Sequence, residues 1–373
     1  MFLIKNLLFP VLLTLALPAV AQTDTTTFRT EEVTFWNQPD SVKLSGTLTM
    51  PNDPTRKRFP AAIVLSGSGA QNRDGVSPAL KNGPKTYKAL AEYLSARGFA
   101  VLRYDDRGAG ASTLGKNPAQ ATGENFARDA RAALNFLKNH VAIDAQRVGI
   151  IGHSEGGTLA PRLARQSDDV AFVVALAGTG VNGGEVMIRQ NQLILRGQGF
   201  DSTSVETYLR EFYTPWVRQV QLANDTASLR RTVLAGLNRL KTALDEGILK
   251  KFGFTPVAEK QIVAQLVAIG HLPWMRDFMT HDPAPDWQGT RCPVLALNGS
   301  RDVQVDADQN LPAIAAALKR GGNRKFRTEK LPGLNHLFQR TKTGSILEYT
   351  TLKQDFDPEA LRLITDWLRQ TLR

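Results

Sequence analysis

Short apolar runs of strand length alternate with longer amphipathic segments over the first half of the chain. The apolar runs are residues 61–65, 100–103, 148–151 and 171–176. The segments with helical spacing between them are residues 88–97, 125–139 and 155–166. Residues 31–50, which come before this alternation, are typical of an antiparallel hairpin. Strands that alternate with helices predict a mostly parallel sheet with helices on both faces.

This alternation stops near Gly180 and resumes at residue 293. The helical stretches in the interruption are residues 202–222, 226–251 and 256–269. The elements expected after it are strands at 293–297 and 325–331 and helices at 310–319 and 358–372. We therefore predict a helical cap over residues 182–290, inserted into an α/β core made of residues 22–181 and 291–373.

The first 21 residues are typical of a signal peptide. Lys5 precedes an apolar stretch from Leu7 to Val20, and Ala19-Val20-Ala21 has the small residues of a cleavage site. Two prolines in this stretch argue against a buried helix. We expect export to the periplasm or the medium, and no later apolar stretch is long enough to span a bilayer.

The charge pattern gives little sign of a macromolecular partner. The net charge of +11 includes a basic cluster, which consists of Lys319, Arg320, Arg324, Lys325, Arg327 and Lys330. No pattern of interleaved aromatic residues suggests base stacking there, so a solvated face is a better interpretation than nucleic-acid binding. Cys292 is the only cysteine, which excludes an intrachain disulfide and a cysteine metal cluster. The sequence does not reveal the oligomeric state.

The strongest chemical signal is the segment from Gly152 to Gly157, which reads G-H-S-E-G-G. It has the form G-x-S-x-G and lies directly between a predicted strand and a predicted helix, which is the context that a nucleophile elbow requires. The flanking glycines allow strand and helix to approach closely at a tight turn. Ser154 is therefore the candidate nucleophile, with a plain tight turn as the alternative.

With this motif the chain resembles the α/β-hydrolase superfamily, within it an exported bacterial branch of esterase-like and serine aminopeptidase-like enzymes. The resemblance extends from Thr27 to the C-terminus. Three further segments carry it, which are residues 66–74 (SGSGAQNRD), 103–108 (RYDDRG) and 297–302 (LNGSRD). It implies an α/β-hydrolase fold with a doubly wound sheet and an inserted helical cap.

A serine nucleophile needs a base, and in this fold the order along the chain is serine, acid, histidine. The five histidines are His140, His153, His271, His281 and His336. Only His336 follows the last predicted strand, where a loop reaches the elbow, so His336 is the expected base. A surface loop histidine is the alternative.

The orienting acid should follow the strand at 293–297. Asp302 lies just beyond it, in the family segment, and is preferred over Asp306, which precedes a helix and suits a capping role. Asp302 would hold the imidazole tautomer without accepting a proton.

Two backbone N–H groups are expected to bind the oxyanion. One belongs to Glu155, the residue after the nucleophile. The other is assigned to Ser68, because the family's His-Gly-x pattern is here Ser66-Gly67-Ser68. The serine in place of histidine leaves the second donor less firmly assigned.

The remaining chemical motifs argue against metals and cofactors. Asp105 and Asp106 lie between two arginines, and an ion-paired structural role is a better interpretation than metal binding. The glycines at 67, 69, 108 and 110 are not followed by the Lys-Ser/Thr pair of a phosphate loop. We expect neither a metal nor a cofactor.

The cap should supply the substrate pocket together with Gly67. Its candidate lining residues are Phe212, Tyr213, Trp216, Trp274 and Phe278, although any of them could belong to the cap's own core. Basic and acidic residues nearly balance over 182–290, which favours an uncharged or apolar acyl group.

These features predict a serine hydrolase that cleaves a small carboxylic ester through an acyl-enzyme. An aminopeptidase or thioesterase with the same triad is the main alternative, and it would need a cap carboxylate such as Glu185, Glu206 or Glu211 near Ser154 to hold a free amino group. A non-catalytic binding protein on the same fold is a third possibility, which the complete triad disfavours.

Overall fold

The computed structural model describes residues 27–222 and 225–373. Its centre is one eight-stranded sheet in the order β1-β2-β4-β3-β5-β6-β7-β8. The strands are β1 (Phe28–Asn37), β2 (Val42–Pro51), β3 (Phe59–Leu65), β4 (Ala100–Tyr104), β5 (Ile143–His153), β6 (Val173–Leu176), β7 (Val294–Gly299) and β8 (Phe326–Leu331). β1 and β2 form the predicted hairpin, and from β4 to β8 all neighbours pair in parallel. The mostly parallel α/β fold is therefore confirmed.

Helices cover both faces of this sheet and exclude water from two apolar layers. The helices of the core are α1 (Thr86–Ser95), α2 (Gly123–Asn139), α3 (Glu155–Gln166), α11 (Ala284–Gly289), α12 (Ala307–Arg320) and α13 (Pro358–Thr371). Apolar side chains of α2, α3 and α12 pack on one face, and those of α1 and α13 pack on the other. Short turns of helix are η1 (Pro78–Leu80), η2 (Pro118–Gln120) and η4 (Ile346–Glu348).

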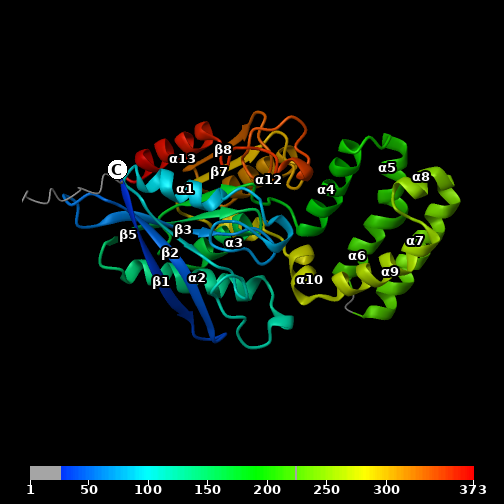
Figure 1. The fold of residues 1–373 in the computed structure, drawn as a ribbon, viewed down its shortest axis with the longest axis horizontal. Helices are drawn as coiled ribbons and strands as arrows, with labels where there is room; N and C mark the ends of the chain where they lie inside the picture. The colour runs from blue at the N-terminus through cyan, green and yellow to red at the C-terminus, as the bar shows by residue number, and fades with distance from the viewer. Residues whose placement is uncertain (1–26, 223–224) are drawn as a thin grey trace, which may run out of the picture.

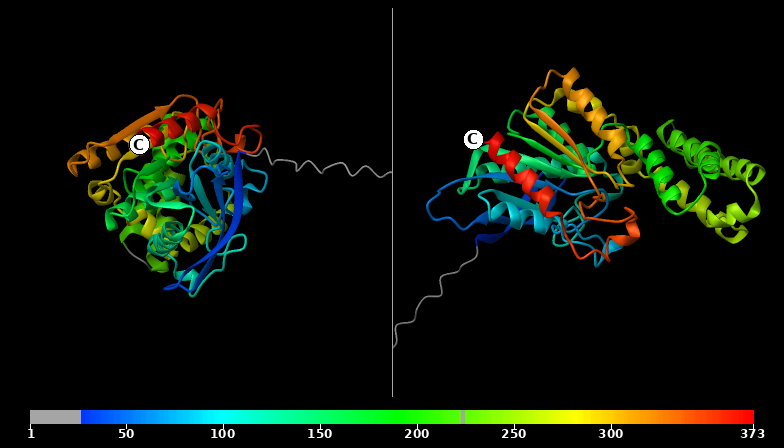
Figure 2. Two further views of the ribbon diagram at one scale, coloured as in Figure 1. Left: turned by 90° about the vertical axis from the view of Figure 1, so that its left-hand side faces the viewer. Right: turned by 90° about the horizontal axis from the view of Figure 1, so that it is seen from above.

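The segment between β6 and β7 is helical, and in its described part it contains no strand. Its helices outside the core are α4 (Gly183–Gly197), α5 (Ser202–Tyr208), the π-helix η3 (Leu209–Tyr213), α6 (Thr214–Leu222), α7 (Thr226–Ala243), α8 (Glu246–Lys251), α9 (Pro256–His271) and α10 (Pro273–Thr280). α5 to α9 project from one end of the core, and α4 and α10 lie between them and the sheet (Figure 1). The second view in Figure 2 shows the same projection from above.

The projecting helices form a cap with an apolar core of its own. Buried side chains of α5, η3, α6, α7 and α9 pack together, separate from the two layers on the sheet. α11, although it falls within residues 182–290, packs on α3 and α12 of the core instead. α4 and α10 are elements that the sequence pattern did not reveal.

Two further expectations from the sequence concern the signal segment and membrane-spanning helices. The predicted signal segment, residues 1–21, lies outside the described residues. Over the described residues, no helix combines the length and the apolar character that crossing a bilayer would take.

Trp287 should contribute strongly to the stability of the core. It belongs to α11, and its side chain is fully buried in an apolar layer on the sheet. Its Nε1 donates a hydrogen bond to the carbonyl oxygen of Thr179 at 2.9 Å. We expect Trp287→Ala to lower the free energy of unfolding by about 3–5 kcal/mol, because it leaves a large cavity. Chemical denaturation of the purified protein measures this. Trp36→Ala, at a position that is 51% exposed, is the matched control, and an equal loss in both variants would contradict the assignment.

Candidate active site

Ser154 lies on the sharp turn between β5 and α3, in a strained backbone conformation. Its φ is 54° and its ψ is −117°, a combination that a residue with a Cβ rarely adopts. The Ser154 N–H donates to the carbonyl oxygen of Leu176 at 2.8 Å, which ties the turn to the neighbouring strand. A Cβ on Gly152 would lie 2.1 Å from the Gly156 oxygen, so this approach of strand and helix requires glycine.

His336 and Asp302 form a buried pair on the loops that follow β8 and β7. His336 Nδ1 and Asp302 Oδ2 are 2.8 Å apart. The other carboxylate oxygen, Oδ1, accepts hydrogen bonds from the N–H groups of Gln304 and Val305 at 2.8 and 2.9 Å. Because Asp302 is an acceptor, we assign the proton of the neutral imidazole to Nδ1, which leaves Nε2 as a base.

Ser154 and His336 line the same pocket, which has a volume of about 280 Å³. Among the described residues, no hydrogen bond joins the Ser154 hydroxyl to the His336 ring. Hydrogen bonds of this kind often shorten only when substrate is bound. The structure therefore brings the three predicted triad residues to the carboxyl ends of β5, β7 and β8, with the acid–base pair already formed.

Asp306, the rival acid, has a different role. It is the N-cap of α12, where its Oδ1 accepts from the Asp308 N–H at 3.1 Å. Its Oδ2 pairs with Arg189 Nε of α4 at 2.6 Å. This carboxylate links the cap to the core and makes no contact with His336.

The side chain of His153 connects the elbow to the loop that carries the base. Its Nε2 lies 2.9 Å from the carbonyl oxygen of His336, and its Nδ1 lies 3.0 Å from the Tyr87 hydroxyl. Burial, with a smaller effect of the nearby His336, lowers the pKa of His153 to about 3. The neutral ring thus donates from Nε2 to His336 and accepts at Nδ1 from Tyr87.

Tyr87 also fixes the loop expected to hold the oxyanion. The Gly67 N–H donates to its hydroxyl oxygen at 3.0 Å, so this amide is not free to bind substrate. The N–H groups of Ser68 and Glu155 have no acceptor among the described residues. Their availability suits the predicted oxyanion donors. Tyr87 is not among the site residues predicted from the sequence, since no motif marks it.

The side chain of Glu155 is buried and links the elbow to the cap. Its Oε1 accepts a hydrogen bond from Trp274 Nε1 of α10 at 2.8 Å. Burial raises the pKa of this carboxyl above its ordinary value, and the hydrogen bond from Trp274 partly opposes the rise. Trp274 is one of the predicted pocket residues, and it lines the pocket around Ser154 together with Gly67, Ser68 and Phe278.

Three of the predicted pocket residues lie elsewhere. Phe212, Tyr213 and Trp216 are buried in the apolar core of the cap, where Trp216 Nε1 donates to the carbonyl oxygen of Leu266 at 3.2 Å. They do not line the pocket around Ser154, so the alternative interpretation, that they form the cap's own core, describes them. Helical periodicity does not distinguish the inner face of a cap from its core.

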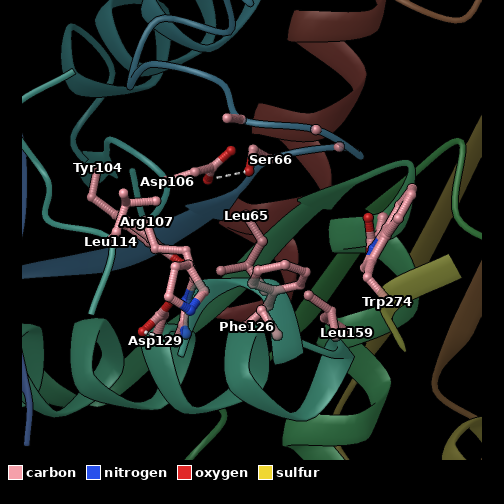
Figure 3. A pocket seen from close by; sticks show the side chains of 16 residues that line it. Leu65, Ser66, Tyr104, Asp106, Arg107, Leu114, Phe126, Asp129, Leu159 and Trp274 are labelled. Carbon is pink, nitrogen blue, oxygen red and sulfur yellow. Dashed lines mark hydrogen bonds and ion pairs between the residues drawn. The ribbon is translucent and has the colours of Figure 1, made fainter. Parts of the chain in front are cut away.

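A second cavity of about 220 Å³ lies behind the loop that carries Gly67 (Figure 3). Asp106 faces it, accepting hydrogen bonds from the Ser66 hydroxyl at 2.5 Å and from the Gln71 N–H at 2.9 Å. Burial raises the pKa of Asp106 to about 7, against an ordinary value of 3.8. The expectation of ion-paired carboxylates is met by Asp105, which binds Arg73 through both oxygens, but is wrong for Asp106, which has no cationic partner among the described residues.

The described residues offer no group of three His, Cys, Asp or Glu side chains arranged to hold a metal ion. The arrangement present is a serine on a strained turn, a histidine paired with a buried aspartate, and two N–H groups without an acceptor, and groups of these kinds can attack an acyl carbon and stabilise the resulting oxyanion.

The chain is similar to several known hydrolases. A family model described as serine aminopeptidase, S33, matches residues 83–232. Esterase EstD from Thermotoga maritima is 35% identical over 127 residues, which are 33% of this chain and 28% of EstD. Cutinase 2 from Thermobifida cellulosilytica is 24% identical over 214 residues, which are 56% of this chain and 68% of the cutinase.

Solved structures with similar folds include an esterase from Pyrococcus furiosus, at a TM-score of 0.53 and 17% identity, with 92% of both chains covered. A proline iminopeptidase-related protein from Thermus thermophilus has a TM-score of 0.52 and 18% identity, and the match covers 91% of this chain and 98% of the other. These solved structures show that the chain has the α/β-hydrolase fold.

The raised pKa of Asp106 predicts a pH-dependent cost in stability. Between about pH 4 and pH 7 the folded protein keeps a proton that the unfolded chain releases, so this group lowers stability as the pH rises through that window, and its cost is constant above it. Asp106→Asn lacks this cost. The difference in Tm between the variant and the wild type should become more positive from pH 5 to pH 8 in thermal unfolding scans. Asp168→Asn, a position away from both cavities, should show no such trend, and a flat difference for Asp106→Asn would refute the shift.

Proposed function

We propose that this protein is a serine hydrolase that cleaves carboxylic esters through an acyl-enzyme on Ser154. The observation that carries this proposal is the buried Asp302–His336 pair in the wall of the pocket that also contains the strained Ser154. A histidine oriented in this way beside a serine hydroxyl is the arrangement that activates an alcohol as a nucleophile.

The reaction follows from the positions of the polar atoms. His336 Nε2 takes the proton of Ser154 as Oγ bonds to the acyl carbon, and the N–H groups of Ser68 and Glu155 bind the oxygen that becomes negative. His336 then gives the proton to the leaving alkoxide, which departs as the alcohol. Water repeats the sequence, and its attack releases the acid and restores Ser154. Each N–H donor is worth about 3–4 kcal/mol of the barrier.

Asp302 stabilises the imidazolium that forms in each half of this cycle. Its two backbone donors, Gln304 and Val305, keep the carboxylate in place. His153 and Tyr87 act as positioning residues, because they hold the His336 loop and the Gly67 loop against the elbow.

The cap carboxylates are engaged away from Ser154, which favours esters over aminoacyl substrates. Glu206 pairs with Arg196, and Glu211 pairs with Arg210 and Arg239. Neither they nor Glu185 are among the residues that line the pocket around Ser154. A free amino group would therefore find no cap carboxylate of the described residues beside the nucleophile.

An aminopeptidase or a thioesterase with the same triad is the second candidate. The observation that favours an aminopeptidase is the match of residues 83–232 to the serine aminopeptidase family.

A fluorophosphonate probe and two substrate panels test the proposal. We expect the probe to label the wild type and not Ser154→Ala, and p-nitrophenyl esters to be hydrolysed faster than aminoacyl-anilides. Faster cleavage of the anilides would favour the aminopeptidase. Absence of labelling in the folded wild type would reject a serine hydrolase and favour a binding protein.

Replacing Asp302 tests whether this residue, and not its neighbour Asp306, is the orienting acid. In Asp302→Asn the amide favours the wrong tautomer of His336, and kcat for an ester should fall by about 10⁴-fold, by analogy with triad dissection. Asp306→Asn is the matched control, because Asp306 lies four residues away and pairs with Arg189 instead. Steady-state kinetics measure both variants. Comparable losses in the two, or nearly normal turnover in Asp302→Asn, would reject Asp302 as the acid.

Export with cleavage after Ala21 stays a prediction from the sequence. Mass spectrometry of the protein recovered from the periplasm or the medium, with a mature terminus at Gln22, is the measurement that checks it.

A further inference from the structure

The second cavity, of about 220 Å³, adjoins the nucleophile without containing it. It shares Gly67 and Trp274 with the pocket around Ser154, and Glu155, the residue after the nucleophile, also lines it. A Cβ built on Gly67 would lie 3.1 Å from the Ser154 Cβ, so Gly67 borders the nucleophile as well as the cavity. A group attached to Ser154 would enter this cavity by passing Gly67 and Trp274.

Most of the cavity's surface is apolar. The apolar residues that line it include Leu65, Leu114, Ala121, Phe126, Leu159 and Trp274. In Figure 3, Trp274 lies at one end, Leu114 and Tyr104 lie at the other, and Leu65, Phe126 and Leu159 lie between them. The lining residues thus extend from Trp274, which both spaces share, to the loop that carries Leu114.

The charged groups in the wall already have partners within the protein. Asp129 binds Arg107 at 2.7 Å, Asp106 accepts from Ser66 and Gln71, and Glu155 accepts from Trp274. An apolar group that enters the cavity displaces none of these bonds.

We propose that this cavity is the acyl subsite of the enzyme and takes a compact apolar acyl group. This inference rests on the ester hydrolysis proposed above. A dry apolar cavity of about 150 Å³ accommodates benzene, so the present volume suits an aromatic ring with a short linker or a chain of about six to eight carbons. The alcohol part of the ester then occupies the pocket that contains His336.

A substitution in the wall of the cavity tests this assignment. Ala121 lines it and lies in the loop after η2, away from the triad. In Ala121→Trp the indole should fill the space, so the ratio of kcat/KM for p-nitrophenyl hexanoate or phenylacetate to that for the acetate should fall by about tenfold or more. Ala119→Trp is the matched control, because Ala119 lies two residues away, is exposed and does not line the cavity. It should keep the wild-type ratio.

A second variant changes the cavity in the opposite direction. Leu114 is 56% exposed, so its truncation does not remove a core side chain, and Leu114→Ala should open the far end of the cavity. We expect octanoate and longer acyl groups to gain in kcat/KM relative to hexanoate. This gain keeps the test informative if Ala121→Trp fails to fold.

Several outcomes would overturn the inference. A loss in Ala121→Trp that follows the size of the alcohol at constant acetyl group would assign the cavity to the leaving group. An equal ratio in Ala121→Trp and Ala119→Trp, or faster turnover of a 4-aminobutyrate ester than of the pentanoate ester, would also reject an apolar acyl subsite. If the wild type hydrolyses no ester and is not labelled at Ser154, the proposed function itself has failed, whereas turnover with no dependence on the acyl group rejects only the subsite.

Discussion

The strained backbone at Ser154 is the constraint on which the rest of this structure depends. A side chain at positive φ is tolerated only where its surroundings fix it. Here the Ser154 N–H bonds to Leu176 on the next strand, and glycines at 152 and 156 let β5, α3 and the end of β3 come together. The central position of β5 in the sheet supplies the rigidity, because it is hydrogen-bonded to β3 on one side and to β6 on the other. Catalytic geometry is thus a property of the whole sheet.

A single histidine extends this rigidity to the loops of the site. His153 belongs to the elbow, yet its two ring nitrogens contact the His336 carbonyl and the Tyr87 hydroxyl, which in turn binds the Gly67 N–H. One buried, uncharged network therefore positions the loops that carry His336 and Gly67. A fully satisfied network of this kind favours one arrangement, because any displaced member would leave a buried polar atom without a partner.

The sequence was most informative where a chemical motif could be combined with the order of elements along the chain. The alternation of strands and helices, the elbow at Ser154 and the order serine, acid, histidine were enough to predict the fold and to nominate Asp302 and His336. The roles of Tyr87 and Asp106 could not be predicted, because each depends on residues distant in the sequence, such as Gly67 and Ser66. The burial of Phe212, Tyr213 and Trp216 in the cap's own core could not be predicted for another reason, since a helix in a small domain buries aromatic side chains whether they face a substrate or each other.

The separate apolar core of the cap has an evolutionary consequence. Because the cap buries its own side chains and meets the sheet mainly through α4 and α10, mutations that reshape α5 to α9 leave the strained turn at Ser154 undisturbed. Cap and catalytic scaffold can then diverge at different rates. A lineage of such enzymes is expected to explore new substrates by remodelling one module, while the other keeps a nearly constant mechanism.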